Sequence, residues 1–148
     1  MTAVLTTGEI PGDDELRELY DSVGWSTYTG DIPTLRRRLE GSARVVTGRD
    51  AGVLVGLARI VSDGATIAYL QDVLVHPRTQ RTGLGRRLVE AAFEPYSHIR
   101  QHVLLTDDEP RQRFTDDEPR QRSFYESLGF AEIRDIDSGS LRAFVRMR

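Results

Sequence analysis

Apolar residues follow two periods along this chain, one typical of helices and one typical of strands. From Leu16 to Val23 they recur at helical spacing, directly after three acidic residues at positions 13–15. Acidic side chains are favoured at the positive end of a helix dipole, so we expect the first helix to begin here. Residues 24–30 have the composition of a turn but carry two aromatic residues. A second helix is expected from Pro33, since proline is tolerated in the first helical turn.

Three apolar stretches follow, at residues 44–47, 52–61 and 65–75, and each is rich in Val, Ile, Leu or Ala. Turn-like dipeptides at 49–50 and 63–64 separate them. Apolar runs between turn signals are typical of strands, and short connections make successive strands antiparallel neighbours. We therefore predict a three-stranded meander.

The rest of the pattern predicts a helix at 83–93, a strand at 102–106, a helix at 123–128 and a closing strand at 141–147. Pro95 follows the first of these helices, and proline cannot continue a helix. Helices and strands in this order predict an α/β fold. We expect a mixed, mostly antiparallel central sheet with helices on both faces.

The composition narrows the range of functions. A chain of 148 residues is expected to fold as a single domain, residues 1–148. It has no cysteine, which excludes disulfides and thiolate nucleophiles, and its three histidines lack the spacing of a metal site, so no metal is expected. The formal charge of −3 argues against nucleic-acid binding, and no long apolar stretch predicts membrane insertion. These features fit a cytoplasmic protein.

The most informative segment follows the third predicted strand. Gln80, Gly83 and Gly85 form the pattern Q-x-x-G-x-G where the next helix is expected to begin. Glycines let the backbone turn tightly and approach a ligand, and the first amides of a helix lack partners within the helix. Such amides, at the positive end of the helix dipole, favour a pyrophosphate. Glycine pairs also form ordinary turns, so this spacing alone does not decide the function.

Three motifs in this order resemble the GNAT superfamily of acyl-CoA-dependent N-acyltransferases. The end of the family's fourth strand reads D-x-x-V-x-P, as at 72–77, and its pyrophosphate loop reads Q/R-x-x-G-x-G/A, as at 80–85. A later helix ends F-Y-x-x-x-G-F, as at 124–130. The resemblance spans residues 53–130. It implies the GNAT-like acyl-CoA N-acyltransferase fold and, as activity, direct transfer of an acetyl group from acetyl-CoA, the expected co-substrate, to a primary amine.

By this resemblance, two segments are expected to contact the coenzyme. The main chain of the third predicted strand would bond to the pantetheine arm, and the loop amides would hold the pyrophosphate. Arg81 and Arg86 can add positive charge, with a solvated arginine as an equal alternative. The expected coenzyme-binding residues are Val73, Leu74, Val75, Gln80, Arg81, Thr82, Gly83, Leu84, Gly85 and Arg86.

Two catalytic residues are expected, Tyr125 and Asp72. Tyr125 matches the family tyrosine that resembles a general acid for the departing thiolate, and a phenol can donate that proton; its alternative role is packing in the helix. Asp72 matches an acidic position that lies by the acceptor amine in diamine-acetylating relatives, where a carboxylate can bind an ammonium or relay its proton through water. In a regular strand Gln71 and Asp72 face opposite sides, so both reach the acceptor only if a bulge intervenes.

The acceptor is expected to be a small-molecule amine in a compact pocket for a cation, contacted by Trp25, Tyr28 and Gln71. The two rings could stack on an aromatic or hydrophobic amine, or merely close a small core. An arylalkylamine and a polyamine both fit at this stage. A homodimer is compatible with the sequence, which carries no signal for oligomeric state.

One departure and one duplication mark the segment before Tyr125. Many relatives have an asparagine seven residues before the tyrosine, where this chain has Glu118, and a carboxylate cannot donate a hydrogen bond as an amide does. The octapeptide TDDEPRQR occurs at 106–113 and again at 115–122, which is a tandem duplication. Its prolines are not tolerated inside a helix, so we expect an exposed insert near 107–117 and a helix that starts no earlier than about Glu118. The insert is either a tolerated replication slip or a lid over the acceptor site.

Other functions stay open at this point. A non-catalytic acyl-CoA-binding or sensor protein, whose insert blocks the acceptor side, is one alternative, and a protein-lysine or N-terminal acetyltransferase is another. A dinucleotide-binding oxidoreductase is disfavoured, because the glycine spacing is not G-x-G-x-x-G and a meander precedes it.

Overall fold

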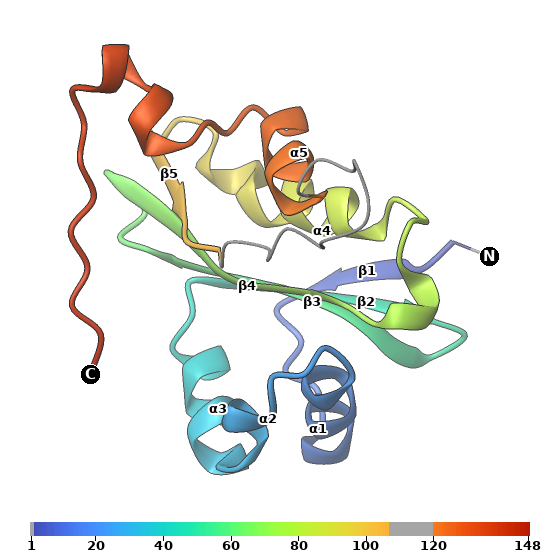
Figure 1. Cartoon of the computed structure of the whole chain (residues 1–148). Coiled ribbons are helices and arrows are strands. Elements are labelled where there is room, and N and C mark those ends of the chain that lie inside the picture. The colour runs from blue at the N-terminus through green and yellow to red at the C-terminus, as the bar shows by residue number, and fades with distance from the viewer. Residues whose placement is uncertain (1, 107–119) are drawn as a thin grey trace, which may run out of the picture. The chain divides into compact units, whose positions relative to one another are not determined.

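The computed structural model describes residues 2–106 and 120–148, and the chain divides into two compact units, Met1–Leu105 and Thr106–Arg148. The first unit contains a five-stranded sheet in the order β1-β2-β3-β4-β5 (Figure 1). Strands β1 to β4 are antiparallel neighbours and β5 is parallel to β4, which confirms the mixed, mostly antiparallel sheet. The strands are β1 (Val4–Thr7), β2 (Arg44–Asp50), β3 (Val53–Ser62), β4 (Ile67–Val75) and β5 (Gln101–Leu104).

Helices cover both faces of this sheet, as predicted. Helices α1 (Asp13–Ser22), α2 (Ser26–Thr29) and α3 (Ile32–Glu40) lie on one face, and α4 (Leu84–Phe93) lies on the other (Figure 1). Asp31 caps α3, since its side chain accepts a hydrogen bond from the backbone N–H of Thr34 at 3.1 Å. The 3₁₀ turns η1 (Pro77–Thr79) and η2 (Glu94–Tyr96) flank α4, and η2 contains the proline that ends this helix.

The core of the first unit lies between α1, α3 and the sheet. Leu19 from α1, Leu35 from α3 and Leu57 from β3 are fully buried and belong to one apolar cluster. On the opposite face, α4 approaches the sheet closely because Gly56 has no side chain. A Cβ at Gly56 would lie 2.8 Å from Cδ1 of Leu88. The start of α4, and with it the preceding loop, is thereby packed against β3.

The second unit contains α5 (Arg120–Ser127) and the 3₁₀ turns η3 (Ile133–Asp135) and η4 (Asp137–Gly139). The expected limit near Glu118 for the start of this helix lies outside the described residues. Gly129 follows the helix with a φ of 92°, a conformation that favours glycine, and so stops the helix as expected.

Three segments differ from the expected secondary structure. Strand β1 was not predicted, because four residues from Val4 to Thr7 carry too short a pattern, and their pairing with β2 creates the strand. Residues 24–30 include the short helix α2 rather than only a turn. The predicted strand at 141–147 has no regular secondary structure, and Phe144 within it is 92% exposed. An apolar pattern forms a strand only where its backbone pairs with another strand, and residues 141–147 pair with none of the described strands. The expected insert near 107–117 lies outside the described residues.

Candidate functional site

One edge of β4 is open where the coenzyme was expected. Strand β5 pairs with β4 only over residues 67–70, so along the described chain the second half of β4 has a neighbour on the β3 side alone. The N–H of His76 donates to the carbonyl of Val55 in β3 at 2.8 Å. Since backbone groups alternate in direction along a strand, the amides of Val73 and Val75 point to the open edge.

The neighbouring residues support this assignment. The side-chain amide of Gln80 donates to the carbonyl of Val75 at 3.3 Å, so this carbonyl is accessible from the loop. Leu74 instead directs its backbone toward β3 and its side chain into the core, where it is 2% exposed. Of the three strand residues expected to contact pantetheine, the geometry therefore favours Val73 and Val75.

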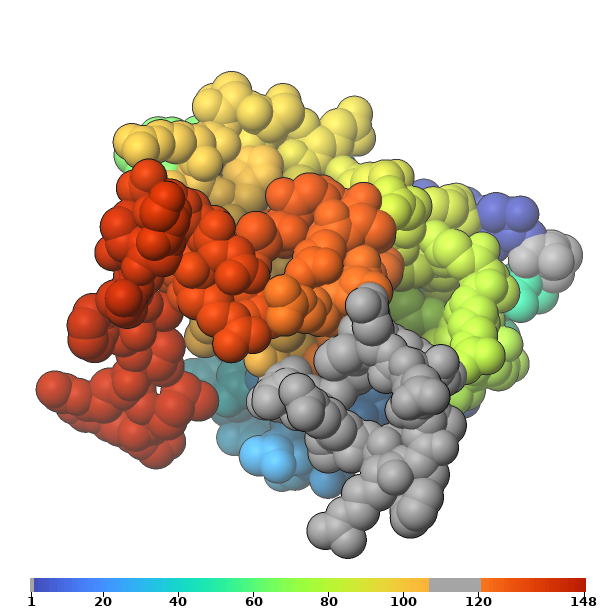
Figure 2. Space-filling model, turned by 45° about the horizontal axis from the view of Figure 1, so that its top comes forward, coloured from blue at the N-terminus to red at the C-terminus, as the bar shows by residue number. Residues whose placement is uncertain are grey.

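The loop between β4 and α4 turns sharply and stays at the surface. Arg81 and Gly83 both have positive φ, 62° and 85°, so the chain reverses within three residues. Gly83 is the N-cap of α4 and has no side chain to accept hydrogen bonds from the first helical turn. The start of α4 thus presents backbone amides and the positive end of a helix dipole to an anion. Residues 80–83 are exposed, and Figure 2 shows the yellow-green segment that carries them at the surface.

Two arginines of this loop region lie on the exposed surface. Arg81 is exposed in the turn, and Arg86 forms an ion pair with Glu90 one helical turn later at 3.1 Å. Such a surface pair contributes little to stability, so it does not prevent Arg86 from turning to a phosphate.

A β-bulge lies in the middle of β4. Arg59 pairs with Asp72 but Ile60 pairs with Leu70, which leaves Gln71 as the extra residue. In a regular strand Gln71 and Asp72 would point to opposite faces of the sheet. The bulge removes this alternation, so both side chains can reach one face.

The residues around the bulge show which face this is. Arg59 and Val61 are two residues apart in β3 and share a face, so their partners Asp72 and Tyr69 share it as well. Gln71 lines a surface groove together with Tyr69 and Val61. Asp72 is buried on the face that α1 covers, since the hydroxyl of Tyr20 in α1 donates to it. The groove is lined by Val61, Ser62, Asp63, Ile67, Tyr69 and Gln71.

Asp72 is held by two partners in the interior. It is 1% exposed, its Oδ2 accepts a hydrogen bond from Nε of Arg59 at 2.5 Å, and the same oxygen accepts one from the Tyr20 hydroxyl at 2.9 Å. Arg59 also donates to Oγ of Ser42 at 3.4 Å. Burial, with the nearby Asp72 carboxylate, raises the pKa of the Tyr20 phenol, so this group stays protonated and donates.

The two aromatic residues expected at the acceptor side pack on Tyr20. Ring centroids lie 6.1 Å apart for Tyr20 and Trp25, and 5.6 Å apart for Tyr20 and Tyr28. The guanidinium of Arg38 lies 4.9 Å from the Tyr28 ring centre, a cation–π contact. Tyr20 therefore joins the aromatic cluster to Asp72. Trp25 and Tyr28 are half-buried, so they serve the core and keep part of their surface exposed.

Tyr125 lies on α5 in the second unit and is half-buried. Its ring makes edge contacts with Phe124 and Phe130, at centroid distances of 5.1 and 6.2 Å, and the N–H of Phe130 donates to its carbonyl at 3.1 Å. Burial raises the pKa of the Tyr125 phenol, which keeps it in the protonated form that a general acid requires.

Comparison with known proteins identifies the family. The sequence model described as an acetyltransferase (GNAT) domain matches residues 41–132, more than half of the chain. This chain belongs to the GNAT acetyltransferase family. It is 33% identical over 127 residues to the uncharacterized N-acetyltransferase ycf52 of Pyropia yezoensis, a match that covers 83% of this chain and 66% of that relative. The chain thus spans about two thirds of the length of the curated relatives it matches.

Solved structures share the GNAT fold over the whole chain. The GNAT family acetyltransferase SP0256 of Streptococcus pneumoniae TIGR4 is 25% identical, with a TM-score of 0.79 over 99% of this chain and 98% of that one. The structure of AAC(6')-Iy in complex with a CoA bisubstrate analogue matches with a TM-score of 0.71 at 14% identity, over 100% of this chain and 99% of that one. The second likeness is one of fold alone.

Two residues of this GNAT chain were missed from the sequence, Arg59 and Tyr20. A signal for Arg59 exists, because it is the one charged residue in the run VLVGLARIVS and lies opposite an acidic residue in the next strand of the meander. Tyr20 carries no such signal, since its helical spacing only predicts a core residue.

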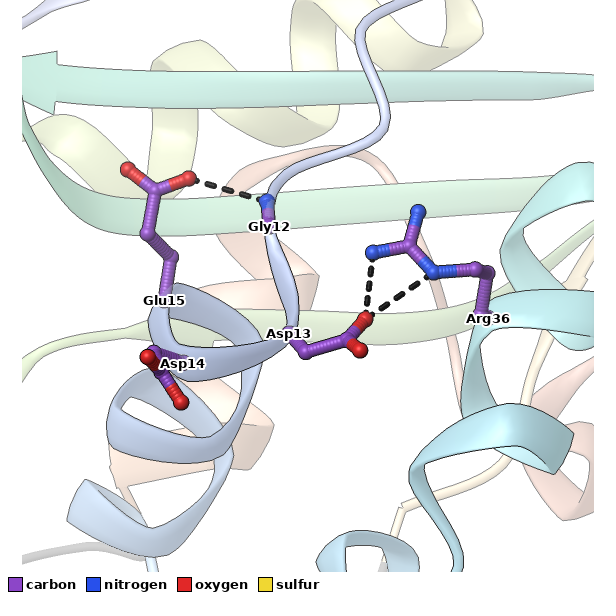
Figure 3. Close-up of a pocket in the computed structure, with 5 residues that line it drawn as sticks. All are labelled: Gly12, Asp13, Asp14, Glu15 and Arg36. Carbon is purple, nitrogen blue, oxygen red and sulfur yellow. Dashed lines mark hydrogen bonds and ion pairs between the residues drawn. The ribbon is translucent and has the colours of Figure 1, made fainter.

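A second hollow lies at the start of α1, away from the GNAT motifs. It is lined by Gly12, Asp13, Asp14, Glu15 and Arg36 (Figure 3). Arg36 points at Asp13 and pairs with it at 2.5 Å, while Glu15 turns back to accept the N–H of Gly12 at 3.0 Å. These contacts fix the first turn of α1.

Within residues 2–106 and 120–148, no group of three or more His, Cys, Asp or Glu side chains is placed to hold a metal ion. The helices of the same ranges are all too short or too polar to cross a bilayer.

Proposed function

We propose that this chain is an acetyl-CoA-dependent N-acetyltransferase that transfers the acetyl group directly to the primary amine of a small molecule. The observation that carries the proposal is the open edge of β4 followed by the uncapped first turn of α4. It provides backbone donors and acceptors for pantetheine and amides for a pyrophosphate. AAC(6')-Iy, which shares the fold, has been solved with CoA.

In this proposal the coenzyme is held mainly by backbone. The groups at Val73 and Val75 bond to the pantetheine arm, and the amides from Arg81 to Arg86 hold the diphosphate. Gln80, Thr82 and Leu84 shape the turn, with Leu84 anchored in the core at 2% exposure. Gly83 supplies the left-handed turn. Gly85 keeps the start of the helix free of a side chain near the diphosphate.

The reaction needs few further groups. The neutral amine nitrogen attacks the thioester carbonyl, the carbon–sulfur bond breaks, and one proton leaves the amine as one proton reaches the thiolate sulfur. Tyr125 donates the proton to sulfur as the general acid. Asp72 serves the amine on the acceptor side, together with Gln71 in the adjoining groove and the rings of Trp25 and Tyr28.

The proposal is tested by release of CoA thiol when the purified protein is mixed with acetyl-CoA and a panel of amines. The panel contains arylalkylamines, alkylamines, polyamines and a lysine-bearing peptide. Amine-dependent thiol release with a small amine supports the proposal. Tight CoA binding without turnover would establish a sensor instead, and turnover with the peptide alone would establish a protein acetyltransferase.

A further inference from the structure

The two oxygens of the Asp72 carboxylate have different environments. Oδ2 takes both hydrogen bonds, from Tyr20 and from Arg59. Oδ1 is buried and has no hydrogen-bond partner within the described ranges. A buried polar oxygen without a partner is rare and lowers the stability of the fold. We therefore expect a water or a ligand group to donate a hydrogen bond to Oδ1.

The charge of Asp72 is already balanced inside the protein. Arg59 is 6% exposed and Asp72 is 1% exposed, and charges at this depth are tolerated only as a pair. Tyr20 adds no charge, because its phenol stays protonated. The cluster therefore has one unused hydrogen-bond acceptor and no net charge.

The adjoining groove carries one further negative charge, on the exposed Asp63, whose two oxygens already accept hydrogen bonds within their own turn. Asp63 is the carboxylate that lines it, and this side chain accepts hydrogen bonds from the backbone N–H groups of Ala65 and Thr66 at 2.9 and 2.8 Å. Tyr69 presents a phenol ring, and burial raises its pKa, so it is neutral. The guanidinium of Arg38 adds a positive charge over the ring of Tyr28, in the aromatic cluster around Tyr20.

Resting on the proposed function, we propose that Arg59 and Tyr20 are positioning residues that make Asp72 a charge-balanced hydrogen-bond acceptor for the substrate amine. Oδ1 accepts the N–H of the amine, directly or through one water. Arg59, and not a second ammonium of the substrate, is the cation that Asp72 holds. The acceptor class that fits is a monoamine with an apolar or aromatic body, rather than a polyamine.

The first test compares matched amines with the unmodified protein. Hexylamine and 1,6-diaminohexane have the same length and differ by one ammonium, so thiol release measures the charge preference directly. We expect kcat/KM to be about tenfold higher for hexylamine, since an uncompensated charge near a compensated pair gains no partner. Turnover with a preference for the diamine overturns this inference alone. Absence of turnover with every amine overturns the proposed function and this inference with it.

The second test changes the charge balance. Arg59→Met leaves the carboxylate without its cation, and we expect the ratio of kcat/KM values to shift about tenfold toward the diamine. The double variant Arg59→Met with Asp72→Asn removes both charges, buries no unpaired charge and should keep the wild-type preference. Arg49→Met, which removes an arginine outside the cluster, is the control and should leave the ratio unchanged.

A merely structural role for Arg59 lowers kcat/KM for both amines together and leaves their ratio constant. An unchanged ratio in Arg59→Met therefore overturns the inference. If that single variant does not fold, the double variant decides, because a fall of diamine turnover relative to hexylamine turnover there shows that the Asp72 charge had bound the second ammonium, which overturns the inference.

Discussion

The proposed coenzyme side of this protein consists mainly of backbone groups, whereas the proposed acceptor side consists of side chains. The proposed coenzyme side is a continuous segment from β4 to α4, in which backbone groups are the expected binding groups. The proposed acceptor side combines side chains from α1, α2, β3 and β4, with the buried pair of Arg59 and Asp72 at its centre. Backbone groups are the same in every residue, so the first site depends on conformation, whereas the second depends on side-chain identity at positions far apart in sequence.

This difference predicts that substitutions can change one proposed side without changing the other. The loop depends on the left-handed turn at Gly83 and on the uncapped first turn of α4, so its function is set by a few neighbouring residues. An acceptor site made of side chains can change its charge through one residue, such as Arg59, without disturbing the coenzyme.

The largest expected effect is on stability, at the acceptor side. Arg59→Met should lower the free energy of unfolding by about 3–5 kcal/mol, because it leaves a buried carboxylate without its partner. Arg49→Met, whose ion pairs with Glu9 and Glu15 are partly exposed, should cost about 1 kcal/mol or less. Urea unfolding of both variants measures the difference. Equal losses would contradict the special role of the buried pair.

The next effect concerns proton transfer. Tyr125→Phe removes only the hydroxyl and should lower kcat by about 100-fold or more, as expected for loss of a general acid. Affinity for CoA should stay within about twofold, because the coenzyme is held by backbone elsewhere. Steady-state kinetics and calorimetry separate the two quantities. Tyr96→Phe, a buried tyrosine of η2, is the control, and an unchanged kcat in Tyr125→Phe would move the proton donor to another group.

A smaller effect isolates the coenzyme loop. Gly83→Ala and Gly64→Ala both place a side chain at positive φ, 85° and 75°, so each should cost about 1–2 kcal/mol of stability. Only Gly83→Ala should also weaken CoA binding, by about tenfold, since it alters the turn that presents the amides. Thermal unfolding and CoA titration of the pair provide the comparison. Equal CoA affinities would show that the turn does not form the binding site.

The smallest effect is the dependence of stability on pH at the start of α1. Hydrogen bonds from Arg49 are the main cause that holds the pKa values of Glu9 and Glu15 below their ordinary value of about 4.5. A lowered pKa in the folded state stabilises the protein above the ordinary value, and this contribution is lost as pH falls through the folded pKa. Arg49→Met should therefore flatten the stability curve between about pH 5 and pH 3. A curve of unfolding free energy against pH that runs parallel to that of the wild type would show that Glu9 and Glu15 do not contribute to this pH dependence.

Local signals explain how much could be predicted from the sequence. The meander, α4 and the loop pattern follow from residues close together, as does the stop at Gly129, and the structure confirms these elements. Strand β1 and the lack of a strand at 141–147 depend on pairing with a strand far away in the sequence, which no local pattern contains. The candidate site also has a part that local sequence does not predict. The bulge at Gln71 and the contact of Tyr20 with Asp72 arise only from tertiary packing.

The central claim is that the backbone from β4 to the first turn of α4 binds the coenzyme. Amide chemical shifts measured by NMR during a titration with CoA test it most directly. We expect the largest shifts on the amides of Val73, Val75 and residues 81–86, with saturation at one coenzyme per chain. Shifts that leave these amides unchanged while CoA binds elsewhere would contradict it.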